Sequence, residues 1–220
     1  MLPIRSATTA QQVHDWLYRC VLRGDLLPGT RLSETDIAVQ LGLSRQPVRE
    51  AFIRLAADGL AEVLPQRGTY IGRISVRSVL SARLIREAVE SDLARLVAKA
   101  RPDLTAMSNE LVLQAQADAA GDVPAFIEAD DRFHLAMATA AGFPVVWQDL
   151  DRLKAQMNRL RHLSMRTFDR GATIAQHRAI LTALEAADPD AAEAAIRVHL
   201  RQMLTELPQI AATHPDYFTD

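Results

Sequence analysis

The sequence holds a single cysteine, Cys20, in 220 residues, so no internal disulfide can form. This scarcity is typical of a reducing compartment, and we expect a cytoplasmic protein. No apolar run reaches the ~18 residues that a membrane-spanning helix needs. The first residues lack the uninterrupted apolar segment of a secretory signal, so we expect neither export nor a membrane partner.

Aromatic residues are also scarce, at 5% of the chain, and only two of the 25 basic residues are lysines. Apolar residues make up 49% and charged residues 24%, which excludes a mainly disordered chain. The frequent Ala, Leu and Arg favour helices over strands, so we expect a mainly α fold. A chain of this length can bury a sizeable core in one large or two small domains.

Charge and helix-breaking residues are unevenly distributed along the chain. Residues 1–75 hold nine Arg against seven Asp and Glu, a net charge of +2, and are interrupted by many Gly and Pro residues. The remaining residues hold sixteen basic and twenty acidic side chains, a net charge of −4, in long uninterrupted stretches. These differences predict two domains, over residues 1–75 and 76–220, and the basic charge of the first is weak evidence for a nucleic-acid partner.

The first part of the chain has the element order of a winged helix-turn-helix. The predicted helices cover residues 10–23, Glu34–Leu41 and Arg45–Asp58, and the predicted strands cover Ala61–Leu64 and Thr69–Gly72. Ser33 and Ser44 are the expected N-caps of the second and third helices. In this order of elements, the third helix is the one that enters the major groove of DNA.

Two arginines, Arg45 and Arg49, lie one turn apart at the start of that third helix. In this position their guanidinium groups can reach guanine edges or phosphates. Alone, two arginines on a helix are more typical of a solvated surface. The tight turn ending at Ser44 and the basic residue Arg67 beside Gly68 favour the DNA-binding interpretation.

The same segment contains a dense set of motif residues: Pro28-Gly29, Leu41-Gly42-Leu43-Ser44-Arg45, Pro47-Val48-Arg49-Glu50-Ala51, Asp58-Gly59-Leu60 and Arg67-Gly68. With them, residues 28–72 resemble the DNA-binding domain of GntR-family transcription regulators. The resemblance implies a homodimer on a short palindromic operator, with Gly68 at a wing tip that approaches the minor groove. The DNA-contacting residues that it implies are Thr35, Ser44, Arg45, Gln46, Arg49, Arg67 and Gly68. Thr35 stands where some relatives carry a further DNA-contacting arginine.

The second part of the chain predicts an all-α bundle. Gly and Pro positions divide it into six expected helices, over residues 76–100, 103–119, 123–141, 144–167, 172–187 and 190–207. Asp188 as N-cap with Pro189 at the first helical position is a clear helix start.

Three of these helices carry polar residues within their apolar faces: Asp130 and His134, His177, and His199. A buried carboxylate is costly unless it is paired or coordinated. One aspartate and three histidines in a core satisfy one another poorly without a cation, whereas Zn, Ni or Mn suits this donor set. Periodicity alone leaves hydrogen-bonded core histidines as an equal alternative.

The spacing of these residues is Asp-x-x-x-His, a second His 43 residues later, and a third 22 residues after that. This pattern resembles the metal site of the FCD effector domain, which follows the winged helix in FadR-type regulators; the six-helix count is similar to the VanR-like branch. The resemblance implies a divalent metal, zinc above all, with open positions for a carboxylate-bearing metabolite. Gln176 replaces the usual acidic residue before the second histidine. The other histidines, His14, His162 and His214, match no ligand position and are expected at the surface.

Arg86 and Glu90 share a stripe of the first helix in this domain. They can form an intrahelical ion pair, or Arg86 can point inward and bind an effector carboxylate. Further effector-binding candidates are Trp147, Arg159 and Arg161.

These features favour a non-enzymatic, metabolite-responsive transcription regulator, most simply a repressor that a small organic acid releases from its operator. Two alternatives remain at this stage. One is a metal-dependent hydrolase or lyase fused to a DNA-targeting domain, with Glu90 or Glu128 as the acid beside a metal-bound water. The other is a constitutive DNA-binding protein with a purely structural metal.

Overall fold

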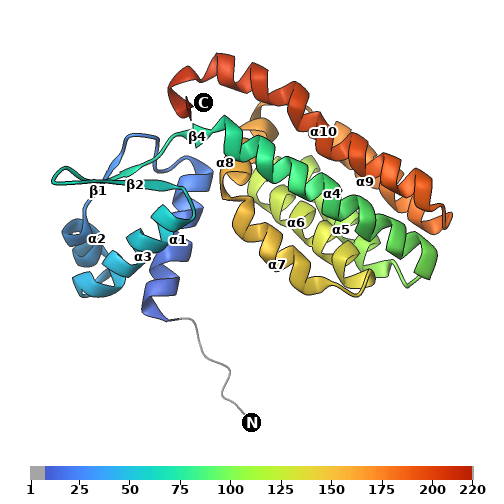
Figure 1. The fold of residues 1–220 in the computed structure, drawn as a ribbon, viewed down its shortest axis with the longest axis horizontal. Coiled ribbons are helices and arrows are strands. Elements are labelled where there is room, and N and C mark those ends of the chain that lie inside the picture. Colours follow the sequence, from blue (N-terminus) through green and yellow to red (C-terminus); the bar gives the residue numbers. More distant parts are fainter. Residues whose placement is uncertain (1–7, 220) are drawn as a thin grey trace, which may run out of the picture. The chain divides into compact units, whose positions relative to one another are not determined.

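The computed structural model describes residues 8–219, which form two compact units (Figure 1). One unit comprises residues 8–76 together with 214–219, and the other comprises residues 77–213. The C-terminal segment, which we assigned to the second domain from the sequence, lies in the first unit because strand β5 (Phe218–Thr219) pairs in parallel with β4 (Ile74–Ser75). A short 3₁₀ turn, Pro215–Tyr217, precedes β5.

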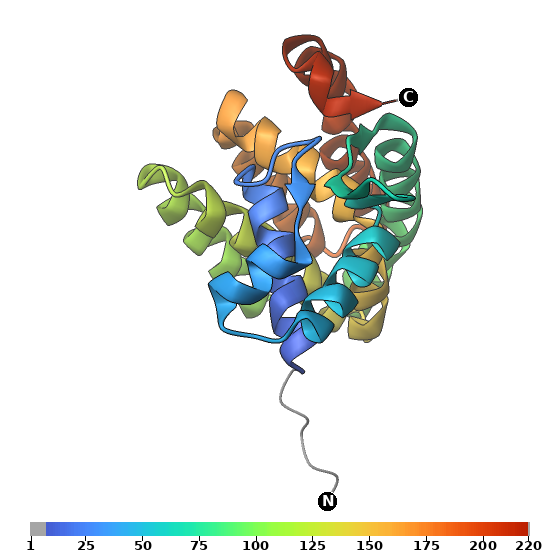
Figure 2. The same cartoon turned by 90° about the vertical axis from the view of Figure 1, so that its left-hand side faces the viewer.

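The first unit is a winged helix-turn-helix (Figure 2). Its helices are α1 (Thr9–Arg23), α2 (Glu34–Leu41) and α3 (Arg45–Ala57). Its antiparallel sheet has the order β1-β3-β2, with β1 at Arg31–Leu32, β2 at Ala61–Leu64 and β3 at Gly68–Ile71. The three helices and the β2–β3 hairpin agree with the sequence analysis. The two-residue strands β1, β4 and β5 carry too short a pattern to have been predicted.

The core of this unit lies between α1 and α3, because each helix buries one apolar stripe. On α1 the buried residues are Ala10, Val13, Leu17 and Val21, and on α3 they are Val48, Ala51, Phe52 and Leu55. The Ser33 hydroxyl accepts a hydrogen bond from the Asp36 amide at 3.2 Å and caps α2, as expected. Ser44 occupies the N-cap position of α3, but its side chain makes no capping hydrogen bond.

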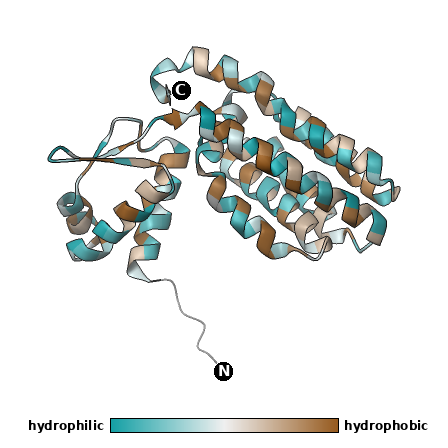
Figure 3. Cartoon of the chain, viewed as in Figure 1, coloured by the Kyte–Doolittle hydropathy of each residue, from teal (hydrophilic) through white to brown (hydrophobic). Residues whose placement is uncertain are grey.

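The second unit is a bundle of seven helices within the described residues, one more than expected. They are α4 (Val76–Ala100), α5 (Thr105–Ala119), α6 (Val123–Ala140), α7 (Pro144–Leu153), α8 (Ala155–Thr167), α9 (Arg170–Glu185) and α10 (Pro189–Thr213). Hydrophilic and hydrophobic positions alternate along these helices, as in amphipathic elements that share one core (Figure 3). None of the described helices is long and apolar enough to cross a membrane.

The additional helix arises because the segment expected as one helix over 144–167 breaks at Lys154. This lysine is fully buried, and its Nζ lies 3.2 Å from both Asp131 Oδ1 and Asp151 Oδ1. The same Nζ lies 3.8 Å from the centre of the Trp147 ring. A buried ammonium needs such partners, and no Gly or Pro at this position marks the break in the sequence.

Candidate functional site

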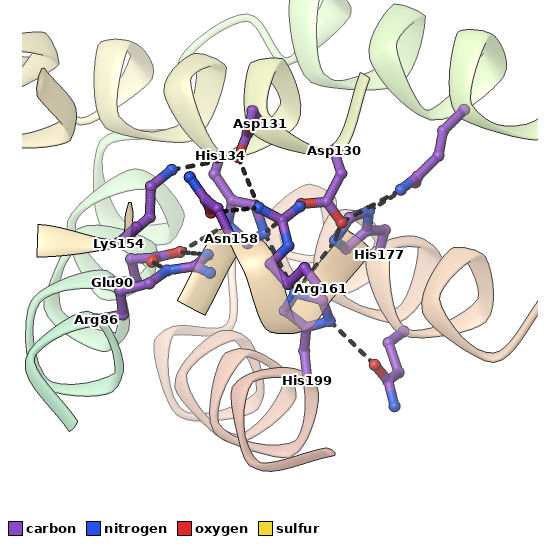
Figure 4. Close-up of polar contacts among 12 residues, drawn as sticks. Arg86, Glu90, Asp130, Asp131, His134, Lys154, Asn158, Arg161, His177 and His199 are labelled. Carbon is purple, nitrogen blue, oxygen red and sulfur yellow. Dashed lines mark hydrogen bonds and ion pairs between the residues drawn. The ribbon is translucent and has the colours of Figure 1, made fainter. Parts of the chain in front are cut away.

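Four side chains meet in the core of the second unit: Asp130 and His134 from α6, His177 from α9, and His199 from α10 (Figure 4). One potential ligand atom of each lies within 4.8 Å of the others. Nε2 of His199 lies 3.2 Å from Nε2 of His134 and 3.3 Å from Nε2 of His177. The structure thus brings together the four residues that the sequence singled out.

The opposite nitrogen of each ring, Nδ1, faces a side-chain oxygen. These oxygens belong to Glu90 at 2.6 Å from His134, Gln114 at 2.8 Å from His177 and Gln176 at 3.0 Å from His199. Because amide oxygens only accept, the hydrogen bonds of His177 and His199 assign the ring proton to Nδ1, and the nearby carboxylate of Glu90 favours a proton on Nδ1 of His134 as well. Three Nε2 lone pairs then converge, and they repel one another unless a cation lies between them. The donor set therefore fits a metal ion.

Burial keeps the rings of His177 and His199 in the protonation state that binds metal. His177 is fully buried, and this desolvation lowers its pKa to about 3. Desolvation also holds the pKa of His199 well below its ordinary value. The rings of His177 and His199 are therefore neutral at physiological pH, as metal ligation requires.

The carboxylate of Asp130 is held from two sides. Arg161 of α8 donates a hydrogen bond to Oδ2, and the Gln114 amide donates to Oδ1 at 3.3 Å. Burial raises the pKa of Asp130, but the charge of Arg161 outweighs this effect and holds the pKa below its ordinary value. The carboxylate is thus ionised and oriented beside the three histidines.

A cavity of about 50 Å³ lies beside this cluster. Arg86 and Arg161 are among the residues that line it, together with Asp130 and His199 of the cluster. Of the other effector candidates, Glu90, Trp147 and Arg159 are buried but do not line the cavity.

The ring of Trp147 instead supports a metal-ligand candidate. It stacks on His134, with ring centres 5.5 Å apart and planes at 6°. Glu90 lies between His134 and Arg86, whose Nε donates to Glu90 Oε1 at 2.5 Å. Arg86 therefore forms the intrahelical ion pair and also lines the cavity, so the two interpretations of this residue are compatible.

The acids that the enzymatic alternative needs are not placed for catalysis. Glu90 contacts His134 through Nδ1, on the side of the ring that faces away from the cluster. The Glu128 side chain is 68% exposed and lies 3.9 Å from Arg132. Neither carboxylate is positioned to act as a general base on a water bound among the histidines.

The remaining histidines differ from the expectation of surface positions. His162 is buried in α8, and His14 and His214 are half-buried. Nε2 of His14 lies 2.7 Å from Asp58 Oδ2, and this hydrogen bond raises the pKa of His14. Asp58 lies 44 residues away in the sequence, so no local pattern could have revealed the pair.

Gln114 is the functional candidate that sequence reasoning missed. It follows Met107 and Leu111 on the buried stripe of α5 and is itself fully buried. A polar residue within an apolar stripe is the same signal that identified Asp130, so the sequence did contain the information.

The predicted DNA-contacting residues of α3 are exposed at its N-terminal end. Ser44, Arg45, Gln46 and Arg49 are all exposed, as are Thr35 on α2 and Arg67 in the hairpin turn. Gly68 has a φ of +110°, which favours glycine, and it begins β3 directly after that turn.

One further residue accepts hydrogen bonds from both arginines of α3. Glu34 of α2 accepts from Arg45 Nη2 at 3.1 Å and from Arg49 Nε and Nη2 at 3.0 Å each. The first turn of α2 thereby orients both guanidinium groups on the exposed side of the unit. Sequence reasoning missed Glu34 because its acidic side chain was interpreted only as favourable for the helix N-terminus.

Comparisons with known proteins match both units. The model of the family described as "Bacterial regulatory proteins, gntR family" matches residues 9–71, and the FCD domain model matches residues 83–202. The HTH-type transcriptional repressor RspR of Escherichia coli K12 is 36% identical, over 96% of this chain and 95% of that protein. The probable D-xylose utilization operon transcriptional repressor of Paenarthrobacter nicotinovorans is 30% identical, over 90% and 88%. The solved structure of E. coli McbR/YncC superimposes with a TM-score of 0.77 at 25% identity, covering 93% of this chain and 99% of that one.

Proposed function

From its membership of the GntR family of bacterial transcription regulators and its FCD domain, we propose a function for this chain. It is a repressor that a small organic acid releases from its operator. The observation that carries the proposal is the convergence of three histidine Nε2 atoms and a carboxylate beside a cavity lined by two buried arginines. Two relatives are named as repressors, which supports repression over activation.

The winged helix-turn-helix is the proposed DNA-binding unit. Arg45 and Arg49, at the start of α3, would contact base edges in the major groove. Arg67 and Gly68, at the hairpin turn, would follow the backbone toward the minor groove. A homodimer would present two such units to the two halves of a palindromic operator.

The histidine cluster is the proposed metal centre. Asp130, His134, His177 and His199 would hold one divalent ion, which we expect to be zinc in the purified protein; nickel and manganese suit the same donors. The ion would supply a positive centre with an open coordination position for a carboxylate oxygen. Arg86 and Arg161 line the same end of the cavity and would pair with that carboxylate, which favours organic acids as ligands.

Release from DNA would follow from differential binding. An acid that binds the non-DNA-binding conformation more tightly shifts the protein toward it. A coupling free energy of about 1–3 kcal/mol corresponds to a 5- to 150-fold loss of operator affinity.

Fluorescence anisotropy with a labelled duplex from the region upstream of the gene tests the proposal. Metal-loaded protein is titrated onto the duplex in the presence of hydroxy-, keto- and sugar acids. We expect at least one acid to weaken binding within the stated range. If none of the panel changes DNA affinity, the constitutive DNA-binding protein with a structural metal is correct. Consumption of an acid with turnover would instead establish the enzymatic alternative.

A further inference from the structure

The cavity beside the histidine cluster has a second polar end. On α10, Gln202 and Glu206 follow His199 by about one and two helical turns, which are ~5 and ~10 Å along the helix axis. On α4, Arg83 precedes Arg86 by about one turn. All five side chains line the cavity, so a ligand whose carboxylate lies at the His199 end extends toward Arg83 and Gln202.

Two buried atoms at this far end have no hydrogen-bond partner among the described residues: Nε of Arg83, a donor, and Oε1 of Gln202, an acceptor. The other polar atoms of these side chains are engaged. Arg83 Nη1 donates to Glu87, and Gln202 Nε2 donates to Glu206 Oε1 at 2.5 Å. A buried donor or acceptor without a partner is costly, and a ligand group that satisfies both atoms would gain affinity.

The chemistry of the two atoms selects the ligand group. An ammonium only donates, so it would leave Arg83 Nε without an acceptor. A keto or carboxylate oxygen only accepts and would leave Gln202 Oε1 unsatisfied. A hydroxyl group both donates and accepts, and it is uncharged. It is therefore the group that fits beside both side chains.

Apolar side chains also line the cavity, among them Met157, Leu160 and Met203. They offer a carbon chain apolar contacts. The spacing of about one helical turn between His199 and Gln202, ~5 Å, corresponds to a chain of about four to six carbons. The small volume of the cavity, about 50 Å³, is consistent with a ligand of this size.

We propose that the effector is a short hydroxy acid whose hydroxyl group, on the fourth to sixth carbon when the carboxylate carbon is counted as the first, binds between Arg83 Nε and Gln202 Oε1. This inference rests on the proposed function, because the carboxylate end requires the metal centre and Arg86. It adds the class of acid and names the residues that discriminate it.

Calorimetric titration of the metal-loaded full-length protein tests the inference with acids that differ in one group. The probes are butanoate, 4-hydroxybutanoate and 4-aminobutanoate, and the six-carbon set hexanoate, 6-hydroxyhexanoate and 6-aminohexanoate. In at least one set, we expect the hydroxy acid to bind about tenfold or more tightly than both of its relatives, as expected for a satisfied buried polar pair.

The variant Gln202→Leu removes the amide at nearly constant volume. We expect it to abolish most of the advantage of the hydroxy acid while the unsubstituted acid keeps its affinity. Gln209→Leu is the matched control, because Gln209 lies on the same helix but is exposed.

Three outcomes would overturn the inference. The first is that the hydroxy acid binds no more tightly than its two relatives in either set. The second is that Gln202→Leu weakens binding of the hydroxy acid and of the unsubstituted acid equally. Either result would show that Gln202 does not recognise the hydroxyl group, and the proposed function would remain intact. If no acid of either set binds the metal-loaded protein, this inference fails; the proposed function fails with it only if the hydroxy-, keto- and sugar acids of the anisotropy assay also leave DNA binding unchanged.

Discussion

His177 illustrates how neighbours determine the chemistry of a single side chain. Its ring is fully buried, its Nδ1 proton is engaged by Gln114, and its Nε2 faces His199 at 3.3 Å. The apolar periodicity of α9 predicted that this residue is buried. It could not predict that the acceptor on Nδ1 comes from α5, because that contact spans 63 residues of sequence.

The two arginines of α3 provide the first prediction at this scale. Arg45→Ala and Arg49→Ala should each weaken operator binding by about 1–3 kcal/mol if the side chain contacts a base. Gel-shift titration measures the effect, and Arg54→Ala, an exposed position later on the same helix, serves as the control. Unchanged operator affinity in both variants would rule out this assignment.

Glu34 makes a second, separable prediction. Its carboxylate binds both arginines, and the hydrogen bond from Arg49 is the main cause that lowers its pKa. Glu34→Gln keeps the shape but removes a negative charge close to the DNA. We expect affinity for unrelated DNA to rise and the preference for the operator to fall by about tenfold, because the guanidinium groups lose their fixed orientation. Parallel titrations with operator and scrambled duplexes measure both, and an equal change on the two duplexes would contradict the orienting role.

At the scale of whole elements, local signals predicted most of the helices. The caps and breaks around α2 and the Asp188-Pro189 start of α10 are encoded within a few residues, and they lie where expected. The break between α7 and α8 was missed, because it depends on Lys154 reaching Asp131 on another helix. Tertiary contacts of this kind override local propensity and leave no periodic pattern.

The start of α10 gives a prediction about stability. Asp188 Oδ1 accepts hydrogen bonds from the amides of Asp190 and Ala191, each at 3.0 Å. Asp188→Ala should lower the free energy of unfolding by about 1 kcal/mol, because two amide donors at the helix N-terminus lose their acceptor. Urea denaturation followed by circular dichroism measures this, with the exposed Asp92→Ala as the control. Equal losses in the two variants would show that the cap contributes nothing specific.

The contact between α4 and α10 gives a prediction about pH. Glu87 on α4 accepts from Arg201 Nε at 2.9 Å and from Arg197 Nη1 at 2.8 Å, both on α10. The hydrogen bond from Arg201 is the main cause that lowers the pKa of Glu87 from 4.5 to about 2. Because the folded pKa lies below the unfolded one, the ionised carboxylate stabilises the fold above pH 4.5, and this contribution disappears as the pH falls toward 2.

Glu87→Gln should therefore cost on the order of 2 kcal/mol of unfolding free energy at neutral pH, a value reduced for the partly exposed arginine partners. The difference from the native protein should shrink as the pH falls below 4.5. Urea denaturation at a series of pH values measures this. A difference that is independent of pH would mean that packing, and not the charge of Glu87, joins the two helices.

At the scale of the whole molecule, composition and charge indicated which part of the chain forms each of the two units. The basic N-terminal part forms the winged helix-turn-helix, and the acidic remainder forms the bundle that encloses the histidine cluster. The sequence could not place the C-terminal strand in the first unit, because a two-residue pairing with β4 leaves no compositional trace. It also could not indicate the far end of the cavity, which residues from α4 and α10 form together.

The central claim, that the histidine cluster is a metal centre, is tested most directly by elemental analysis of the purified protein. The comparison is between the native protein, His177→Gln, and His162→Gln, which alters a buried histidine of the same unit outside the cluster. We expect about one divalent ion per chain in the native protein and in His162→Gln, and almost none in His177→Gln, because a neutral amide is a poor substitute for imidazole. A native protein that is folded and free of metal, or equal metal content in the two variants, would contradict the claim.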